Sequence, residues 1–258
     1  SCSAELKAQR NGTVYKGNDP AVRYTGRTLV SSDGSVAFDW VGTYLETRFT
    51  GGRLSVKVSE TGTSYYNVFV DGKLHKVVKV CGTDTLIHLV SGIDKRIHSL
   101  KIQKRSEGEF GKTTIHQFVL SGSGRLAEEP AVRTRHIEFI GNSLTCGYGT
   151  DGKHRDEPFL VETENCNLTF ASMVARYYDA DYTLIAHSGR GAARNYGDSV
   201  RVSKVTMKDR MLNTFDEDLT HKWNFKGYLP DLVVINLGSN DFSTEPHPYK
   251  SEFTKAYK

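Results

Sequence analysis

Long hydrophobic runs are missing from the sequence. None approaches the roughly 18 apolar residues that a membrane-spanning helix needs, so we expect no segment that crosses a bilayer. A strong charge of one sign is missing too: the 34 lysines and arginines nearly balance the 30 aspartates and glutamates, and they form no basic blocks. A nucleic-acid partner is therefore not expected. The 258 residues are 38% hydrophobic and 25% charged, which is typical of a soluble globular protein with one large domain or two modest ones.

Cysteines are few, and their spacing argues against the common cysteine frameworks. Cys2, Cys81, Cys146 and Cys166 form no Cys-x-x-Cys pair and have no histidine at the spacing of a zinc site. We therefore expect no metal, no cofactor and no disulfide framework, although a single Cys146–Cys166 bridge stays open. Cys2 has two interpretations of equal weight. It is either the lipid-bearing first residue of a mature bacterial lipoprotein or an ordinary surface cysteine near a terminus.

The first half of the chain alternates between apolar and polar residues with a period of two, which predicts half-buried antiparallel strands. Between two of these runs, Asp71-Gly72 predicts a tight hairpin, because both residue types tolerate a positive φ. About eight strands with no helix between them are typical of a β-sandwich or jelly roll. The alternating runs cover residues 35–39, 44–49, 53–58, 65–70, 76–80, 85–90, 98–103 and 115–120.

Residues 121–130 carry small and charged side chains and end in a proline, which predicts a linker. We place a domain boundary inside this segment. It separates a β domain over residues 1–125 from a second domain over residues 126–258.

The second half of the sequence has a different pattern, which predicts a helix between apolar strands. Residues 135–140, 181–186 and 231–237 are predicted strands, and the last two are apolar enough to be covered on both faces. The order strand, helix, strand, crossover, strand predicts an α/β domain with a parallel sheet. The helix is indicated by a stripe of apolar residues at helical spacing, which we expect to be buried: Phe170, Met173, Val174 and Tyr177.

Polar and glycine-rich loops follow these three strands, at residues 141–145, 188–194 and 238–241. In an open α/β sheet, ligands bind at the carboxyl ends of the strands. Ser143 in the first loop offers a nucleophile, the second loop offers closely approaching backbone N–H groups, and Asn240 offers an amide. A serine with converging neutral donors is what acyl transfer requires.

Each of these signals also has a simpler explanation. Ser143 or Asn142 is equally suited to cap a helix, and a Gly-x-x-Asp turn after a strand is common. The three loops together, in this order at successive strand ends, favour the catalytic interpretation.

With these loops the sequence resembles the SGNH, or GDSL-type, hydrolases and, among them, carbohydrate esterase family 2. The resemblance is carried by Phe139-Ile-Gly-Asn-Ser-Leu-Thr-Cys-Gly-Tyr-Gly149, by His187-Ser-Gly-Arg-Gly with Arg194-Asn-Tyr-Gly197, and by Val234-Ile-Asn-Leu-Gly-Ser-Asn-Asp-Phe242. It covers nearly the whole chain and implies a jelly roll joined to an SGNH domain. It also implies that Ser143 is the nucleophile. The N–H groups of Ser143 and Gly189 and the amide of Asn240 would then form an oxyanion hole.

The sequence departs from the family pattern in two places. Asn142 stands where the family name implies an aspartate, which looks tolerated among similar esterases. The family's general base is a histidine dozens of residues after the third motif, whereas this chain ends at Lys258, soon after Asp241. We therefore expect a C-terminally truncated α/β domain whose base is not present in this chain. His247 is a weak substitute between two prolines, and His187 is interpreted as a strand-end residue.

Several further residues are candidates for substrate binding. Arg190, Arg194 and Asn195 either bind substrate or hold the glycine-rich loop through internal hydrogen bonds. Trp223 either stacks on a sugar ring or anchors a loop, and the second is favoured. Tyr148 and Phe242 adjoin motif residues and are expected to line the pocket.

These features predict a secreted, periplasmic or surface-attached bacterial esterase that removes acetyl groups from plant polysaccharide such as acetylated xylan or glucomannan. Its partner would be an acetylated polysaccharide or oligosaccharide, with a membrane involved only through a lipid on Cys2. Two alternatives stay open. One is a carbohydrate-binding protein with a decayed or incomplete esterase site, and the other is an SGNH esterase or lipase that acts on a different acyl group.

Overall fold

A computed structural model describes residues 12–128 and 131–258, so Cys2 lies outside the described residues. The described chain forms two compact units. The first unit contains most of residues 12–132. The second contains residues 133–258 together with two short stretches from the first half of the sequence, Trp40–Gly42 and Ser106–Glu109.

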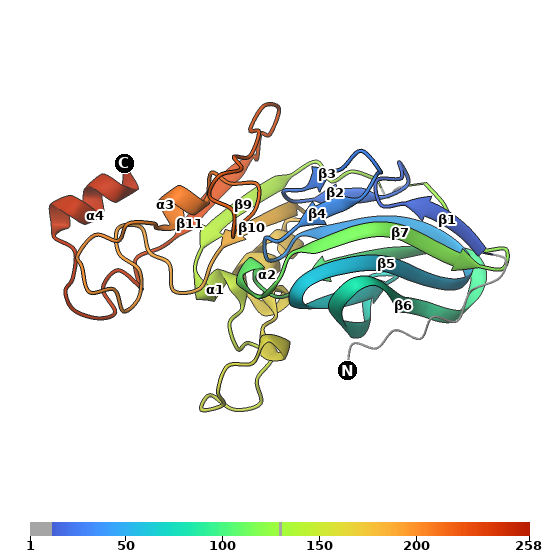
Figure 1. The fold of residues 1–258 in the computed structure, drawn as a ribbon, viewed down its shortest axis with the longest axis horizontal. Coiled ribbons are helices and arrows are strands. Elements are labelled where there is room, and N and C mark those ends of the chain that lie inside the picture. Colours follow the sequence, from blue (N-terminus) through green and yellow to red (C-terminus); the bar gives the residue numbers. More distant parts are fainter. Residues whose placement is uncertain (1–11, 129–130) are drawn as a thin grey trace. The chain divides into compact units, whose positions relative to one another are not determined.

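The first unit is an antiparallel sheet whose two longest strands are β5 and β6 (Figure 1). Strand β5 is the hub, because β2, β6, β7 and β8 all pair with it, while β7 also pairs with β1 and β4. The all-β first half predicted from the alternation is confirmed. The eight strands are β1 (Gly12–Lys16), β2 (Arg23–Thr25), β3 (Leu29–Val30), β4 (Val36–Phe38), β5 (Tyr44–Val70), β6 (Lys73–Lys104), β7 (Thr113–Ser121) and β8 (Arg125–Leu126).

Six of the short strands that the sequence predicts lie within β5 and β6. The ladder between them shifts register at several points, for instance between Thr50 and Gly52 and between Val58 and Glu60. Such irregularities bend a strand, and Gln103 of β6 pairs with both Tyr44 and Asn67 of β5, so the two long strands curl back on themselves. Asp71 and Gly72 form the predicted hairpin with φ of 49° and 76°.

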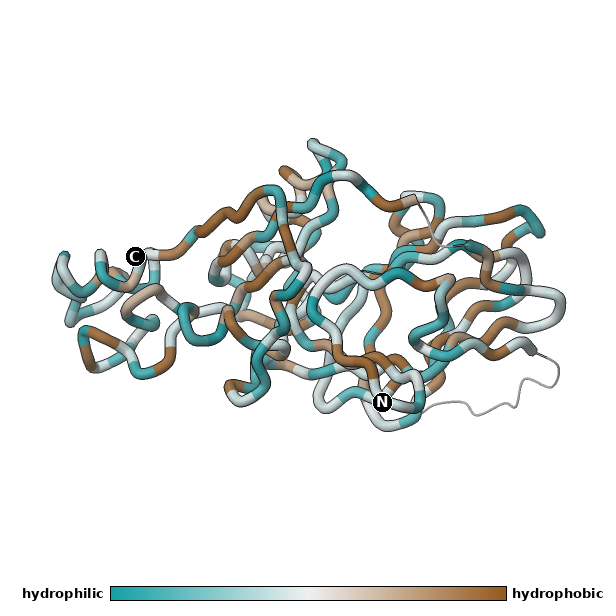
Figure 2. Tube along the Cα trace, turned by 90° about the horizontal axis from the view of Figure 1, so that it is seen from above, coloured by the Kyte–Doolittle hydropathy of each residue, from teal (hydrophilic) through white to brown (hydrophobic). Residues whose placement is uncertain are grey.

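The core of the first unit comes from the inward positions of the alternating runs, and the change between polar and apolar residues along these strands is visible in Figure 2. In β5, Leu54, Val56 and Val58 are buried whereas Arg53 is exposed. The predicted linker is only partly correct. Its residues 125–126 form β8 on the edge of β5, and residues 129–130 lie outside the described part of the chain. The boundary between residues 125 and 126 stays a prediction.

The second unit is built on a parallel sheet in the order β10–β9–β11. Its strands are β9 (His136–Gly141), β10 (Asp181–Ala186) and β11 (Leu232–Asn236). The predicted α/β half with a parallel sheet is therefore confirmed. The helices are α1 (Ser143–Cys146), α2 (Phe170–Tyr177), α3 (Met207–Arg210) and α4 (Lys250–Tyr257), with 3-10 turns at Gly108–Phe110, Val161–Thr163 and Cys166–Leu168. None of the helices in the described residues is long and apolar enough to cross a membrane.

The prediction that α2 buries a stripe of large apolar residues is wrong. Its four apolar residues are all exposed, from 38% for Phe170 to 83% for Tyr177. The helix instead buries Ala171, Ser172 and Ala175. Small side chains on the inner face allow the helix backbone to approach its neighbours closely, so burial follows side-chain size here and not the apolar period.

The prediction that two strands are covered on both faces is confirmed for β10 and wrong for β11. All six residues of β10 are buried, whereas Leu232, Val233 and Ile235 in β11 are about half exposed. Within the described residues, β11 is an outer strand of the sheet with an incomplete cover. The Cys146–Cys166 bridge that the sequence left open is not formed, because both cysteines are free and buried.

Candidate active site

The three polar loops begin side by side because their strands are parallel and in register. Gly141 at the end of β9 pairs with Ala186 of β10 on one side and with Asn236 of β11 on the other. The loops that carry Ser143, Gly189 and Asn240 therefore leave from the same edge of the sheet. The structure thus brings together the starts of the three loops that the sequence analysis singled out.

Asn142 ties the first loop to the third. Its side-chain oxygen caps α1 by accepting the N–H of Leu144 at 3.1 Å, and its amide nitrogen donates to Ser239 Oγ at 3.0 Å. A carboxylate could keep the cap but not the donated bond. This dual use of the amide gives a physical reason for asparagine at this position.

Ser143 is the first residue of α1 and is partly exposed. Its hydroxyl forms no hydrogen bond with any group in the described ranges. The helix-cap interpretation therefore belongs to Asn142, and the Ser143 hydroxyl is available for chemistry.

Asp241 fixes the second loop. Its fully buried carboxylate accepts the backbone N–H groups of Ala192, Ala193 and Arg194 at 3.0, 2.7 and 2.8 Å. Asn240 adds a further tie, because its amide nitrogen donates to the carbonyl of Arg190 at 2.8 Å. One amide hydrogen of Asn240 is left for a ligand.

Arg194 and Asn195 hold the loop through internal hydrogen bonds, which was one of their two interpretations. The buried Arg194 guanidinium donates to backbone carbonyls of Val200, Asp198, Thr244 and Glu245. Asn195 accepts the N–H of Gly191 and donates to the carbonyl of Val205. Both side chains are thus engaged with the protein itself.

Arg190 differs from these two residues, because no hydrogen bond or ion pair of its guanidinium is found within the described residues. Burial and the nearby Arg210 lower its pKa, while the carboxylates of Asp216, Glu109 and Glu217 act in the opposite direction. Arg190 is therefore the loop residue best placed to contact a ligand.

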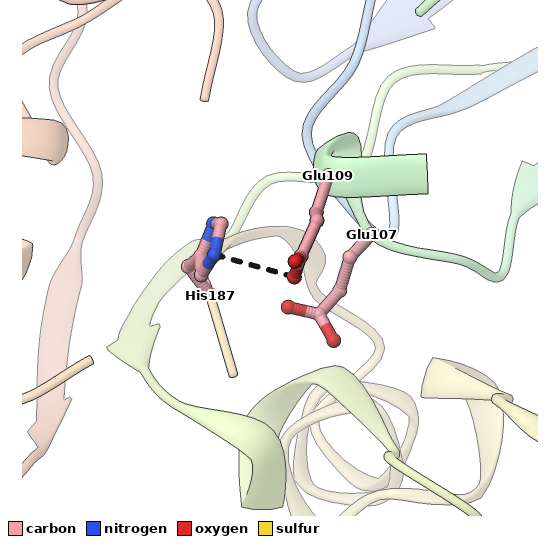
Figure 3. A group of neighbouring side chains, drawn as sticks. All are labelled: Glu107, Glu109 and His187. Carbon is pink, nitrogen blue, oxygen red and sulfur yellow. Dashed lines mark ion pairs between the residues drawn. The ribbon is translucent and has the colours of Figure 1, made fainter. Parts of the chain in front are cut away.

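His187, at the start of the second loop, is more than a strand-end residue. Its Nδ1 lies 2.8 Å from the fully buried carboxylate of Asp216, and its Nε2 faces Glu109 Oε2 at 3.5 Å (Figure 3). Arg210 also donates to Asp216, at 3.0 Å. Burial alone would lower the pKa of His187, but the Asp216 hydrogen bond and the negative charges of Asp216 and Glu107 together outweigh it, and the pKa is raised.

Glu107 is a site residue that sequence reasoning missed. Its carboxylate is fully buried and accepts both the N–H and the hydroxyl of Ser188, each at 2.5 Å. Figure 3 shows Glu107, Glu109 and His187 pointing toward one another, and their possible ligand atoms lie within 4.8 Å. Both oxygens of Glu107 accept hydrogen bonds from Ser188.

No local signal in the sequence marks Glu107 or Asp216 as site residues. Glu107 lies between predicted strands of the β half, 81 residues before Ser188. Asp216 follows His187 by 29 residues and belongs to none of the three motifs. Only the folded chain reveals these contacts.

Two of the four predicted substrate-binding residues lie near the motif loops as exposed aromatic side chains. Tyr148 follows α1 and stacks on Phe159 with ring centroids 3.8 Å apart. Burial and the charges of Glu107, Glu164 and Glu109 raise its pKa. Phe242 packs against Phe253 at 4.9 Å.

Trp223 contacts Tyr228, and His247 packs against Phe242 with ring centroids 5.8 Å apart. Trp223 packs on Tyr228 at 6.2 Å between ring centroids, and the Tyr228 hydroxyl bonds to Glu138 within β9. This contact supports the loop-anchor interpretation. His247 is exposed and lies 3.5 Å from its neighbour Glu245.

The fold and the three loops define the second unit as a hydrolase of the GDSL class. Residues 137–258 match the model for GDSL-like lipases and acylhydrolases, and residues 24–130 match that for the N-terminal part of carbohydrate esterase 2. A solved family two carbohydrate esterase from Clostridium thermocellum, in complex with cellohexaose, is 35% identical with a TM-score of 0.86 over 92% of this chain and 71% of that one. The chain belongs to the carbohydrate esterases of family two.

Curated relatives are longer than this chain. A cellulase/esterase CelE from Acetivibrio thermocellus is 35% identical over 93% of this chain and 29% of its own length. An acetylxylan esterase / glucomannan deacetylase from Cellvibrio japonicus is 33% identical over 85% of this chain and 61% of its own length. The chain therefore spans less than two thirds of either relative.

Proposed function

We propose that this protein is a serine esterase that removes O-acetyl groups from plant polysaccharide such as acetylated xylan or glucomannan. The observation that supports the proposal is the shared edge of the parallel sheet, from which the loops that carry Ser143, Gly189 and Asn240 all leave. The relatives from Cellvibrio japonicus that are named acetylxylan esterase / glucomannan deacetylase support the choice of an acetyl ester.

In the proposed reaction, Ser143 Oγ attacks the acetyl carbonyl carbon while a general base takes its proton. The carbonyl oxygen becomes an oxyanion that accepts hydrogen bonds from the N–H groups of Ser143 and Gly189 and from the free amide hydrogen of Asn240. The sugar oxygen leaves with the proton, and an acetyl-enzyme remains. Water then hydrolyses this ester to acetate and restores the serine hydroxyl.

For the general base we keep the expectation drawn from the resemblance, a histidine well C-terminal to the third motif. Among the described residues, His187 is engaged by Asp216 and Glu109, and His247 is held beside Glu245. Neither is shown in contact with Ser143.

For substrate binding we propose Arg190, Tyr148 and Phe242, which adjoin the motif residues and are at least partly exposed. Trp223 is left out because it packs on Tyr228. Two finer expectations stay predictions: the jelly-roll connectivity of the first sheet and export to the periplasm, cell surface or medium. Export follows from the substrate, because a polysaccharide is too large to enter the cell.

The test is acetate release from acetylated xylan and glucomannan by the full-length protein and by its Ser143→Ala variant. We expect Ser143→Ala to lower the rate by a factor of about 10³ or more. Ser199→Ala is a matched control, since this exposed serine lies in the same unit outside the three motifs. An unchanged rate in Ser143→Ala would refute the assignment. Polysaccharide binding without turnover by the wild type would instead favour the carbohydrate-binding alternative.

A further inference from the structure

Glu107 contacts the residue that precedes the proposed oxyanion donor Gly189. The backbone N–H and the hydroxyl of Ser188 both donate to its two carboxylate oxygens at 2.5 Å. Hydrogen bonds to a charged acceptor are stronger than neutral ones, and two of them to one residue restrict both its backbone and its side chain.

These two bonds help to set where the Gly189 N–H points, together with the bond from the Tyr196 N–H to the Gly189 carbonyl at 2.8 Å. The peptide plane between Ser188 and Gly189 turns with the backbone of Ser188, which Glu107 holds at its N–H and at its hydroxyl. Gly189 itself has φ of 78°, in the left-handed region where glycine provides little restraint of its own. The orientation of the donor therefore depends on the contacts of Ser188.

Glu107 also lies against the helix that carries the nucleophile. Its carboxylate, the Cys146 thiol and the Glu164 carboxylate lie within 4.8 Å of one another, all buried. Cys146 is the last residue of α1, which begins at Ser143. The backbone N–H of Glu107 donates to Glu164 at 3.0 Å, which fixes Glu107 in turn.

The hydrogen bonds keep this buried carboxyl ionised. Burial by itself would raise the pKa of Glu107, but the side-chain hydrogen bond with Glu164, the two bonds from Ser188 and the charge of His187 together outweigh it, and the pKa is lowered. A buried charge retained in this way makes strong bonds to its partners, because little water competes for them.

We propose that Glu107 is a positioning residue for the esterase reaction, which holds the Ser188–Gly189 peptide in the orientation of an oxyanion donor beside the helix of Ser143. This inference rests on the proposed function. Glu107 lies within residues 24–130, which match the model for the N-terminal part of carbohydrate esterase 2. The stretch Ser106–Glu109 that contains it nevertheless packs in the second unit. The N-terminal half of the sequence thus contributes a positioning residue to the hydrolase unit.

The test compares Glu107→Gln and Ser188→Ala with the wild type in the full-length protein, using p-nitrophenyl acetate and acetylated xylan. Glutamine keeps the shape of the side chain but places an N–H₂ group against a donor of Ser188. We expect kcat to fall about 10- to 100-fold in Glu107→Gln, with KM changing less than threefold, since an oxyanion donor acts in the transition state. Glu157→Gln, an exposed carboxylate of the same unit, is the matched control and should keep wild-type kcat.

A second readout separates positioning from a general structural role. A boronic acid that mimics the tetrahedral intermediate should bind Glu107→Gln more weakly by about the same factor as the fall in kcat/KM. The double variant Glu107→Gln/Ser188→Ala should lose less than the product of the two single losses, because Ser188→Ala removes a hydroxyl whose carboxylate acceptor Glu107→Gln has already changed.

Each outcome has a distinct meaning. A wild type without esterase activity would overturn the proposed function, whereas an active wild type with unchanged kcat and boronate affinity in Glu107→Gln would overturn the role of Glu107 alone. If Glu107→Gln does not fold, Ser188→Ala carries the test. It should lower kcat about three- to tenfold at constant KM, and an unchanged kcat would overturn the proposal.

Discussion

Asp241 should be the main stabilising residue of the glycine-rich loop, and its contribution can be predicted from its contacts. Oδ1 accepts the N–H groups of Ala193 and Arg194, while Oδ2 accepts that of Ala192. The carboxylate is fully buried, so water does not replace these bonds when one is lost. A hydrogen bond to a charged group contributes about 1.5–3 kcal/mol.

Two substitutions at this position should therefore differ in a graded way. Asp241→Asn can keep the two bonds at one oxygen, but its N–H₂ group then faces the N–H of Ala192. We expect a loss of about 2–3 kcal/mol in the free energy of unfolding. Asp241→Ala loses all three bonds and leaves three buried donors without a partner, so we expect a loss of about 4–6 kcal/mol.

Urea unfolding followed by tryptophan fluorescence measures this loss. The two tryptophans, Trp40 and Trp223, both belong to the second unit, so the signal reports the unit that contains Asp241. Asp156→Asn is the control, because Asp156 is exposed and its ion pair within the described ranges is with exposed Arg155, so the change should alter stability by less than about 0.5 kcal/mol. Equal losses for Asp241→Asn and Asp241→Ala, or a loss below about 0.5 kcal/mol for either, would refute the reasoning.

Two further predictions concern the same loop. The pKa of His187 is raised in the folded state, so its pairing with Asp216 contributes its full stability below about pH 6.5, the ordinary histidine pKa. This contribution is lost as the pH rises through the raised pKa. The difference in unfolding free energy between wild type and His187→Gln should therefore shrink with rising pH, and a difference that grows would contradict the pairing. At Gly191 an added Cβ would lie 1.9 Å from the carbonyl oxygen of Arg194, whereas at Gly189 it would meet nothing closer than 4.0 Å and only the positive φ opposes it. Thermal unfolding should thus show a loss of about 3 kcal/mol for Gly191→Ala and about 1–2 kcal/mol for Gly189→Ala, and the reverse order would contradict the geometry.

The shared edge of the three loops can be predicted from the sequence, because the strands are recognised from their local apolar pattern and their order indicates a parallel sheet. Once residues 135–140, 181–186 and 231–237 are recognised as parallel strands, their following loops must share one edge of the sheet. The positions of the Ser143, Gly189 and Asn240 loops follow from that rule alone, and the structure confirms the shared edge.

The parts of the site that sequence reasoning missed depend on contacts between distant segments. Glu107 and Asp216 acquire their roles only when strands and loops far apart in the chain come together. The face of α2 was missed for a different reason. Its apolar period indicates a stripe, but close packing selected the side with Ala171 and Ala175, and the larger residues remain exposed.

Trp40–Gly42 and Ser106–Glu109 come from the first half of the sequence but pack into the second unit, so the two halves are not independent modules. Trp40 joins a buried cluster with Ile140, Ile185 and Met207, and its indole N–H donates to the carbonyl of Asn213. Glu107 holds Ser188 in the same unit. A cut in the segment after β7 would remove both side chains from the hydrolase, and an exchange of N-terminal halves between relatives would have to preserve them. The two halves of this sequence are thus expected to have been inherited together, and recombination at the apparent linker would separate the hydrolase from residues that complete it.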